Sequence, residues 1–166
     1  MITYFLQFNQ FYDKIFWVIK MKLLIDADAC PVTDIALECA EKYKIEECIL
    51  LCDTSHLIER DNARTIVVSK GADSADFALV NLVKAGDVVV TQDYGLAAMC
   101  LAKKANVLNQ NGLIFTEFNI GSLLEQRHLS KKIRMAGGRT KGPAKRTKEQ
   151  DEAFIFSLNK ILLENI

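Results

Sequence analysis

The feature that most constrains this chain is an unbroken apolar run that ends in two alternating aspartates. Leu23, Leu24 and Ile25 lead into Asp26 and Asp28, and Pro31 follows closely. Such a run is typical of a strand buried on both faces, and proline suits the first turn of a following helix. Both aspartates are therefore expected at a strand-to-helix junction, where open α/β sheets bind ligands. One aspartate at such a junction could cap the helix or form a turn. That role does not account for the second aspartate.

Further buried strands alternate with helical patterns along the chain. Apolar runs predict strands over residues 48–52, 65–68 and 87–91 and a short fifth strand over 106–109. Helical spacing predicts helices over 31–43, 73–86 and 96–105, and a last one, with a Thr147–Gln150 capping box, that includes 154–162. Helices alternating with strands predict right-handed crossovers. We therefore expect a three-layer α/β fold with a mainly parallel sheet and helices on both faces.

Residues 21–166 are expected to form this single domain, and residues 1–20 an extension to it. The extension is rich in aromatic residues, but it is too short and too polar to span a bilayer and lacks a signal-cleavage pattern. Either Met21 is the native start or the extension docks loosely. The five cysteines form no C-x-x-C pair, so reduced thiols in the cytoplasm are expected, with no membrane partner. The oligomeric state stays open.

Charge is distributed unevenly although the formal net charge is zero. Residues 1–126 hold 11 Lys and Arg against 17 Asp and Glu, whereas residues 127–148 hold 9 Lys and Arg and no acid. The basic segment contains Gly-Gly and Gly-Pro pairs, so we expect a loop over 127–148. It could be merely solvated, but it also suits contact with the phosphates of a nucleic acid. The candidate binding residues are Arg134, Arg139, Lys141, Lys145 and Arg146.

Aspartates follow the predicted strands one after another. They are Asp26, Asp28, Asp53, Asp73, Asp76 and Asp93. Each alone could cap a helix, but capping does not explain why successive units place acids at the same edge of the sheet. Converging carboxylates repel one another, and Mg²⁺ or Mn²⁺ would relieve that repulsion. Such an ion can activate water for attack on a phosphodiester.

Four blocks of the sequence resemble a known family. Residues 26–31, 71–76, 91–97 and 137–143 resemble the signature blocks of the bacterial YaiI/YqxD family, which is regarded as similar to PIN-domain nucleases. The resemblance covers about residues 21–163. It implies a PIN-like fold and a Mg²⁺- or Mn²⁺-dependent nuclease acting on RNA.

The resemblance also assigns roles to individual aspartates. Asp26 corresponds to the first-strand acid, Asp73 or Asp76 to the helix acid, and Asp93 to the acid after the fourth strand. Asp28 belongs to the family's own block, and residues 1–20 have no counterpart. The resulting metal ligands are Asp26, Asp73, Asp76 and Asp93. The catalytic set is Asp26, Asp28, Asp76 and Asp93, with Cys30, Asp53 and Thr91 as secondary candidates.

Two other functions fit parts of the pattern. A haloacid-dehalogenase-type phosphatase would use Asp26 as nucleophile and Asp28 as general acid and base, but an immediate helix at Pro31 leaves no room for that family's insert. A non-catalytic nucleic-acid-binding module would use the acids only structurally. Cys30 could act as a nucleophile, although a buried packing role is favoured. His56 and His128 lie in polar stretches and are expected at the surface.

Overall fold

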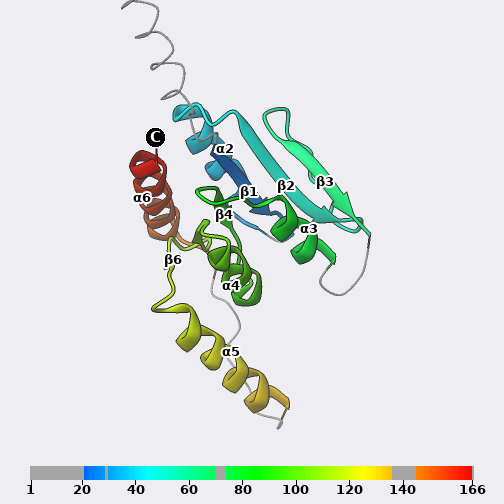
Figure 1. Ribbon diagram of the computed structural model, residues 1–166, viewed down its shortest axis with the longest axis vertical. Helices are drawn as coiled ribbons and strands as arrows, with labels where there is room; N and C mark the ends of the chain where they lie inside the picture. Colours follow the sequence, from blue (N-terminus) through cyan, green and yellow to red (C-terminus); the bar gives the residue numbers. More distant parts are fainter. Residues whose placement is uncertain (1–20, 29, 70–73, 136–144, 166) are drawn as a thin grey trace, which may run out of the picture.

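A central β-sheet with helices on both faces forms the body of the protein (Figure 1). The computed structural model describes residues 21–28, 30–69, 74–135 and 145–165. In chain order the elements are β1 (Lys22–Asp26), α2 (Thr33–Lys42), β2 (Glu47–Asp53), β3 (Arg64–Val68), α3 (Ser74–Leu82), β4 (Val88–Val90), α4 (Tyr94–Ala102), β5 (Asn106–Leu108), β6 (Ile114–Phe115), α5 (Ile120–Met135) and α6 (Lys148–Asn165).

The six strands lie in the order β3-β2-β1-β4-β5-β6, and the first five are parallel. β6 pairs antiparallel with β5. The chain moves outward from β1 to β3 and then restarts on the other side of β1 with β4. The strand order therefore reverses between β1 and β4, the position at which open α/β sheets form a ligand crevice.

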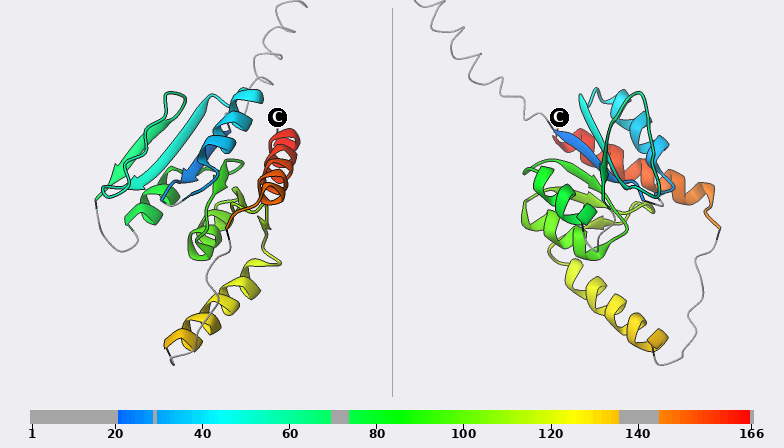
Figure 2. Two further views of the ribbon diagram at one scale, coloured as in Figure 1. Left: turned by 180° about the vertical axis from the view of Figure 1, so that it is seen from behind. Right: turned by 90° about the vertical axis from the view of Figure 1, so that its right-hand side faces the viewer.

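Alternating side chains of the central strands supply two separate cores. Leu23 and Ile25 of β1 pack with α2 and α6 on one face, and Leu24 packs with α3 and α4 on the other. Successive strand residues point to opposite faces, so an unbroken apolar run is what a sheet covered on both sides requires. The views in Figure 2 show the two helical layers from behind and from the side. The expected three-layer, mainly parallel α/β fold, consistent with a PIN-like domain, is confirmed.

The junction after β1 is short. Residues 27–32 connect β1 to α2, whose N-cap is Val32, so Pro31 lies just before the cap and not in the first helical turn as expected. Val32 makes no side-chain capping bond. The link leaves no space for an inserted hairpin.

Two elements differ from the sequence expectation. Residues 127–135, expected as the start of a basic loop, form the second half of α5. β6 was not foreseen. Residues 136–144, which hold the Gly-Gly and Gly-Pro pairs, lie outside the described residues, as does the extension 1–20. No helix in the described ranges is long and apolar enough to cross a membrane.

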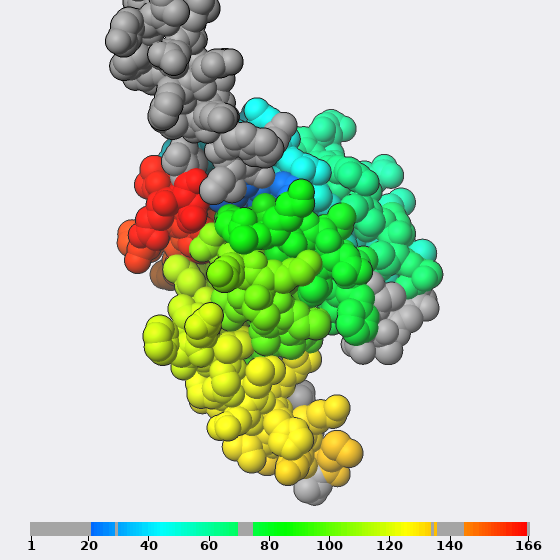
Figure 3. Space-filling view, viewed as in Figure 1, coloured from blue at the N-terminus to red at the C-terminus, as the bar shows by residue number. Residues whose placement is uncertain are grey.

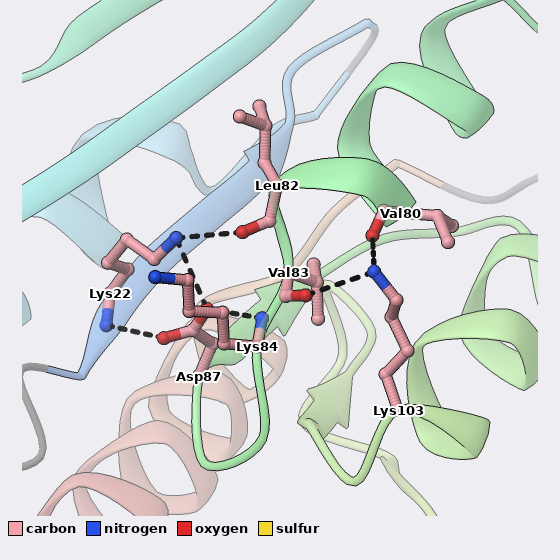
Figure 4. Close-up of polar contacts among 7 residues, drawn as sticks. All are labelled: Lys22, Val80, Leu82, Val83, Lys84, Asp87 and Lys103. Atoms are coloured by element: carbon pink, nitrogen blue, oxygen red, sulfur yellow. Dashed lines mark hydrogen bonds and ion pairs between the residues drawn. The ribbon is translucent and has the colours of Figure 1, made fainter.

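A buried ion pair between Lys22 and Asp87 links the ends of the sheet at which β1 and β4 begin (Figure 4). Asp87 accepts hydrogen bonds from the backbone N–H groups of Lys22 (3.0 Å) and Lys84 (2.8 Å). The Nζ of Lys22 lies 3.5 Å from Asp87 Oδ2 and donates to the carbonyl of Leu82 at 2.7 Å. Lys103 donates to the carbonyls of Val80 and Val83. These lysines donate hydrogen bonds to carbonyls at the C-terminal end of α3, where a helix supplies no N–H partner of its own.

Candidate active site at the carboxyl edge of the sheet

The carboxyl ends of the parallel strands, called the carboxyl edge below, bring Asp26 and Thr91 together. Ile25 is paired with Val90, so the next residues, Asp26 and Thr91, lie side by side. Thr91 is 1% exposed, and its Oγ1 donates a hydrogen bond to Asp26 Oδ2 at 2.7 Å. The secondary candidate Thr91 thus contacts the first-strand acid directly.

Asp26 is surrounded by negative charge. The pKa of Asp26 is raised to about 6. Burial is the largest cause, the hydrogen bond from Thr91 acts to lower the pKa, and the charges of Asp76, Asp28 and Asp93 act to raise it. Three other aspartates of the predicted set therefore lie close enough to act electrostatically on Asp26. Asp76 stands in the first turn of α3 and is partly buried. Asp73 lies outside the described residues.

Asp93 combines a structural role with its place at the carboxyl edge. Its Oδ1 accepts hydrogen bonds from the N–H groups of Gly95 (2.6 Å) and Leu96 (3.1 Å) and so caps α4. Its Oδ2 accepts from Nη1 of Arg127 on α5 at 2.8 Å. Burial acts to raise the pKa of Asp93, but the hydrogen bonds from Arg127, Leu96 and Gly95 hold it below its usual value. The Arg127 side chain is 51% exposed, so this ion pair is not buried.

Asp28 faces the end of β2. Both of its carboxylate oxygens lie 3.2 Å from the backbone N of Asp53, which donates to them. Asp53 Oδ1 in turn accepts from the N–H of Ser55 at 2.6 Å and lies 3.5 Å from Nδ1 of His56. The N–H of Ser55 is the main reason that the pKa of Asp53 is lowered.

Asp28, Asp53 and His56 offer one possible metal-ligand atom each, and these atoms lie within 4.8 Å of one another. Among the described residues this is the only group of three or more His, Cys, Asp or Glu with such spacing. Asp76 and Asp93 act electrostatically on Asp26, but these three aspartates do not form a group with such spacing. His56 is exposed, as its polar stretch predicts. Its nearness to Asp28 and Asp53 was not predicted, and the signal for it is its position in the polar turn after β2.

Cys30 is partly buried, and burial raises the pKa of its thiol. A raised pKa lowers the thiolate fraction near neutral pH, which disfavours nucleophilic use. The packing role expected for Cys30 agrees with its contact with the core that includes residues of α2 and α6.

The candidate nucleic-acid-binding residues are only partly described. Arg139, Lys141 and the side chain of Arg134 lie outside the described set, and Lys145 is exposed. Arg146 donates to Asp151 (2.6 Å), to Asn111 Oδ1 (3.1 Å) and to the carbonyl of Gln110 (2.6 Å). Its guanidinium thus joins the start of α6 to the turn between β5 and β6.

Known proteins resemble the chain over most of its length. The model of an uncharacterized bacterial family, YaiI/YqxD, matches residues 24–164. A UPF0178 protein of Exiguobacterium sibiricum is 49% identical over 144 residues, which cover 87% of this chain and 98% of that protein. A UPF0178 protein of Ruminiclostridium cellulolyticum is 56% identical over 134 residues, 81% of this chain and 87% of that protein. No solved structure matches the chain.

Proposed function

The chain belongs to the YaiI/YqxD family, and from the geometry at its carboxyl edge we propose that it is a nuclease that depends on Mg²⁺ or Mn²⁺ and cleaves phosphodiester bonds in RNA. The observation that carries the proposal is the environment of Asp26. This aspartate is partly buried at the point where the strand order reverses, and the charges of Asp76, Asp28 and Asp93 act on it. Its side chain accepts one hydrogen bond within the described residues, from Thr91.

The donors are carboxylates, the type that a hard divalent cation takes, and Asp26, Asp76 and Asp93 would have to move closer together to share one, because they do not form a group within 4.8 Å of one another. Carboxylate oxygens are the ligands that Mg²⁺ and Mn²⁺ prefer, and a cation would offset both the burial and the repulsion that raise the pKa of Asp26. Asp26, Asp76 and Asp93 would hold the ion, with Asp73 as a further ligand. When bound, it would supply activation of water and neutralisation of the leaving oxygen.

The protein's own residues would organise the reaction. Thr91 orients Asp26 through a 2.7 Å hydrogen bond and accepts another from the N–H of Asp93 at 3.0 Å. Asp28 adds negative charge beside Asp26 and holds the end of β2 through the N–H of Asp53. These contacts fix two acids, one at the end of β1 and one in the turn after β4, before substrate arrives, which lowers the cost of orientation in the reaction.

The proposed partner is RNA, because the basic segment of an otherwise acidic chain would attract a polyanion to a carboxylate site. The five free cysteines suit a reducing compartment, so the cytoplasm is the proposed location. The short link between β1 and α2 speaks against a haloacid-dehalogenase-type phosphatase.

The test is cleavage of end-labelled single-stranded RNA with Mn²⁺ and with chelator. We expect Mn²⁺-dependent cleavage that Asp26→Asn reduces at least about a hundredfold, because it removes a charged ligand. The matched control is Asp61→Asn, an exposed aspartate before β3. Phosphate release from small phosphomonoesters without RNA cleavage would replace the proposal with a phosphatase. RNA binding without any cleavage would replace it with a binding module.

A further inference from the structure

Helix α5 extends away from the body of the protein, below α4 in Figures 1 and 3. Ile120 and Leu123, in its first turn, pack against the core formed with α3 and α4. Beyond that turn most of its side chains are exposed, including Leu129 at 58% and Met135 at 80%. Packing of the body therefore does not explain the sequence of the outer part of this helix.

A pocket of about 660 Å³ runs along one side of α5 and is called the α5 pocket below. It is lined by Leu124, Arg127, His128, Lys131 and Met135. These residues are spaced three, four, seven and eleven positions from the first, so they share one face of the helix. A second hollow of about 480 Å³ shares Leu124 and His128 with it. Both hollows are open to solvent, since Leu124, Leu129 and Met135 along them are exposed.

The lining combines two kinds of chemistry. Arg127 and Lys131 carry permanent positive charge, whereas Leu124 and Met135 offer apolar surface. A ligand that satisfies both carries a negative charge next to an apolar surface. An unpaired nucleotide has both, because its phosphate is charged and its base is not stacked in a duplex.

Arg127 joins this pocket to the carboxyl edge. Its Nη1 donates to Asp93 Oδ2 at 2.8 Å, and the side chain is half exposed. A guanidinium has five N–H donors in a planar fork, so one edge can contact a carboxylate while the other contacts a phosphate. A phosphate bound there would lie next to Asp93.

We propose that the α5 pocket binds an unpaired nucleotide of the RNA strand, with Arg127 and Lys131 on the phosphate and Leu124 and Met135 against the base. The inference rests on the proposed function, because Asp93 belongs to the site that would cleave the strand. It assigns substrate binding to a helix whose residues, apart from Arg134, were not among the sequence candidates. It also restricts the substrate to single strands.

The first test is binding of a labelled single-stranded RNA oligonucleotide in chelator, so that binding is measured without cleavage. Lys131→Gln is compared with Lys132→Gln, which removes the same charge from the neighbouring position but does not line the pocket. We expect Lys131→Gln to weaken binding several-fold and to lower the salt-dependence slope by about 1, since one phosphate contact is lost. Lys132→Gln should change both much less. Equal effects would overturn the assignment.

The second test concerns the base. Met135→Gln removes apolar surface from an exposed side chain, so folding should not be affected. We expect weaker binding of the intact strand with an unchanged salt slope, and no change for an abasic strand. A duplex of the same sequence should bind less tightly than the single strand. Equal loss for intact and abasic strands, or equal binding of the duplex, would overturn the base contact.

These outcomes separate the inference from the proposed function. A protein that binds RNA with this pattern but does not cleave it would overturn the nuclease and support the pocket. A protein that cleaves RNA while the Lys131 and Lys132 variants have the same KM would support the nuclease and overturn the pocket. In an active enzyme, Lys131→Gln should raise KM and leave kcat unchanged.

Discussion

The hydroxyl of Thr91 lies 2.7 Å from Oδ2 of Asp26 and joins two segments that are 65 residues apart in the chain. The same hydroxyl accepts the N–H of Asp93 at 3.0 Å. One buried side chain therefore fixes the ends of β1 and β4, where the strand order reverses. Two acids of the candidate site owe their relative position to this threonine.

Thr91→Val should raise the pKa of Asp26 above its value of about 6. The hydroxyl donates to the carboxylate and lowers this pKa, so its removal favours the protonated acid. The variant should also lose about 1–2 kcal/mol of stability, because the N–H of Asp93 loses its acceptor. Carboxyl-carbon NMR titration measures the pKa. Thr91→Ser keeps the hydroxyl and is the control; the same shift in both variants would contradict the prediction.

Asp26→Asn should stabilise the protein near neutral pH. The pKa of Asp26 rises from 3.8 to about 6 on folding. The unfolded chain therefore loses this proton at lower pH than the folded chain, and destabilisation develops as pH rises from about 4 to about 6. Above about pH 6 this destabilisation reaches on the order of 3 kcal/mol. An asparagine carries no titratable proton and therefore does not cause it. Below about pH 4 the advantage should vanish.

Urea unfolding at several pH values measures this difference. Asp61→Asn, the exposed control, should show no comparable gain at neutral pH. An advantage of Asp26→Asn that is the same at all pH values would show that its origin is not the titration of Asp26.

The central strands were predictable from sequence, and so was the sheet edge at which Asp76, Asp28 and Asp93 act electrostatically on Asp26. A metal site shared by these aspartates stays a prediction. β1 and β2 are unbroken apolar runs because helices cover both faces of the sheet, and parallel strands end at one edge. The contacts within that edge were not predictable. Asp28 binds the backbone of Asp53, an arrangement that depends on the register of β1 and β2, in which Asp26 is paired with Leu51.

The helix α5 was missed for a different reason. Its apolar residues, including Leu124, Leu129 and Ile133, are distributed around the helix and do not form one stripe, because most of it packs against nothing in the described structure. The pattern that usually reveals a helix is therefore absent. Metal binding, cleavage and the roles of Arg139, Lys141 and Asp73 stay predictions.

Asp87→Asn should destabilise the protein by about 3 kcal/mol, measured by urea unfolding. Asp87 is 2% exposed, accepts the N–H groups of Lys22 and Lys84, and pairs with the Lys22 ammonium. An asparagine would place an amide donor opposite one of these donors and leave the ammonium without its counter-charge. Asp61→Asn is again the control and should change stability by less than about 0.5 kcal/mol. Similar losses in both variants would contradict a structural role for the pair.

Gly112 and Gly121 should respond in opposite directions to alanine. Gly112 has a φ of 80° in the turn between β5 and β6, and a Cβ there would overlap the carbonyl of Ala153 in α6. Gly112→Ala should therefore cost at least about 2 kcal/mol, since neither the backbone nor the helix can give way cheaply. Gly121 in α5 has no atom within 4 Å of such a Cβ, so Gly121→Ala should gain up to about 1 kcal/mol from helix propensity. Thermal unfolding of both variants measures the contrast, and a stable Gly112→Ala would mean that α6 does not pack on this turn.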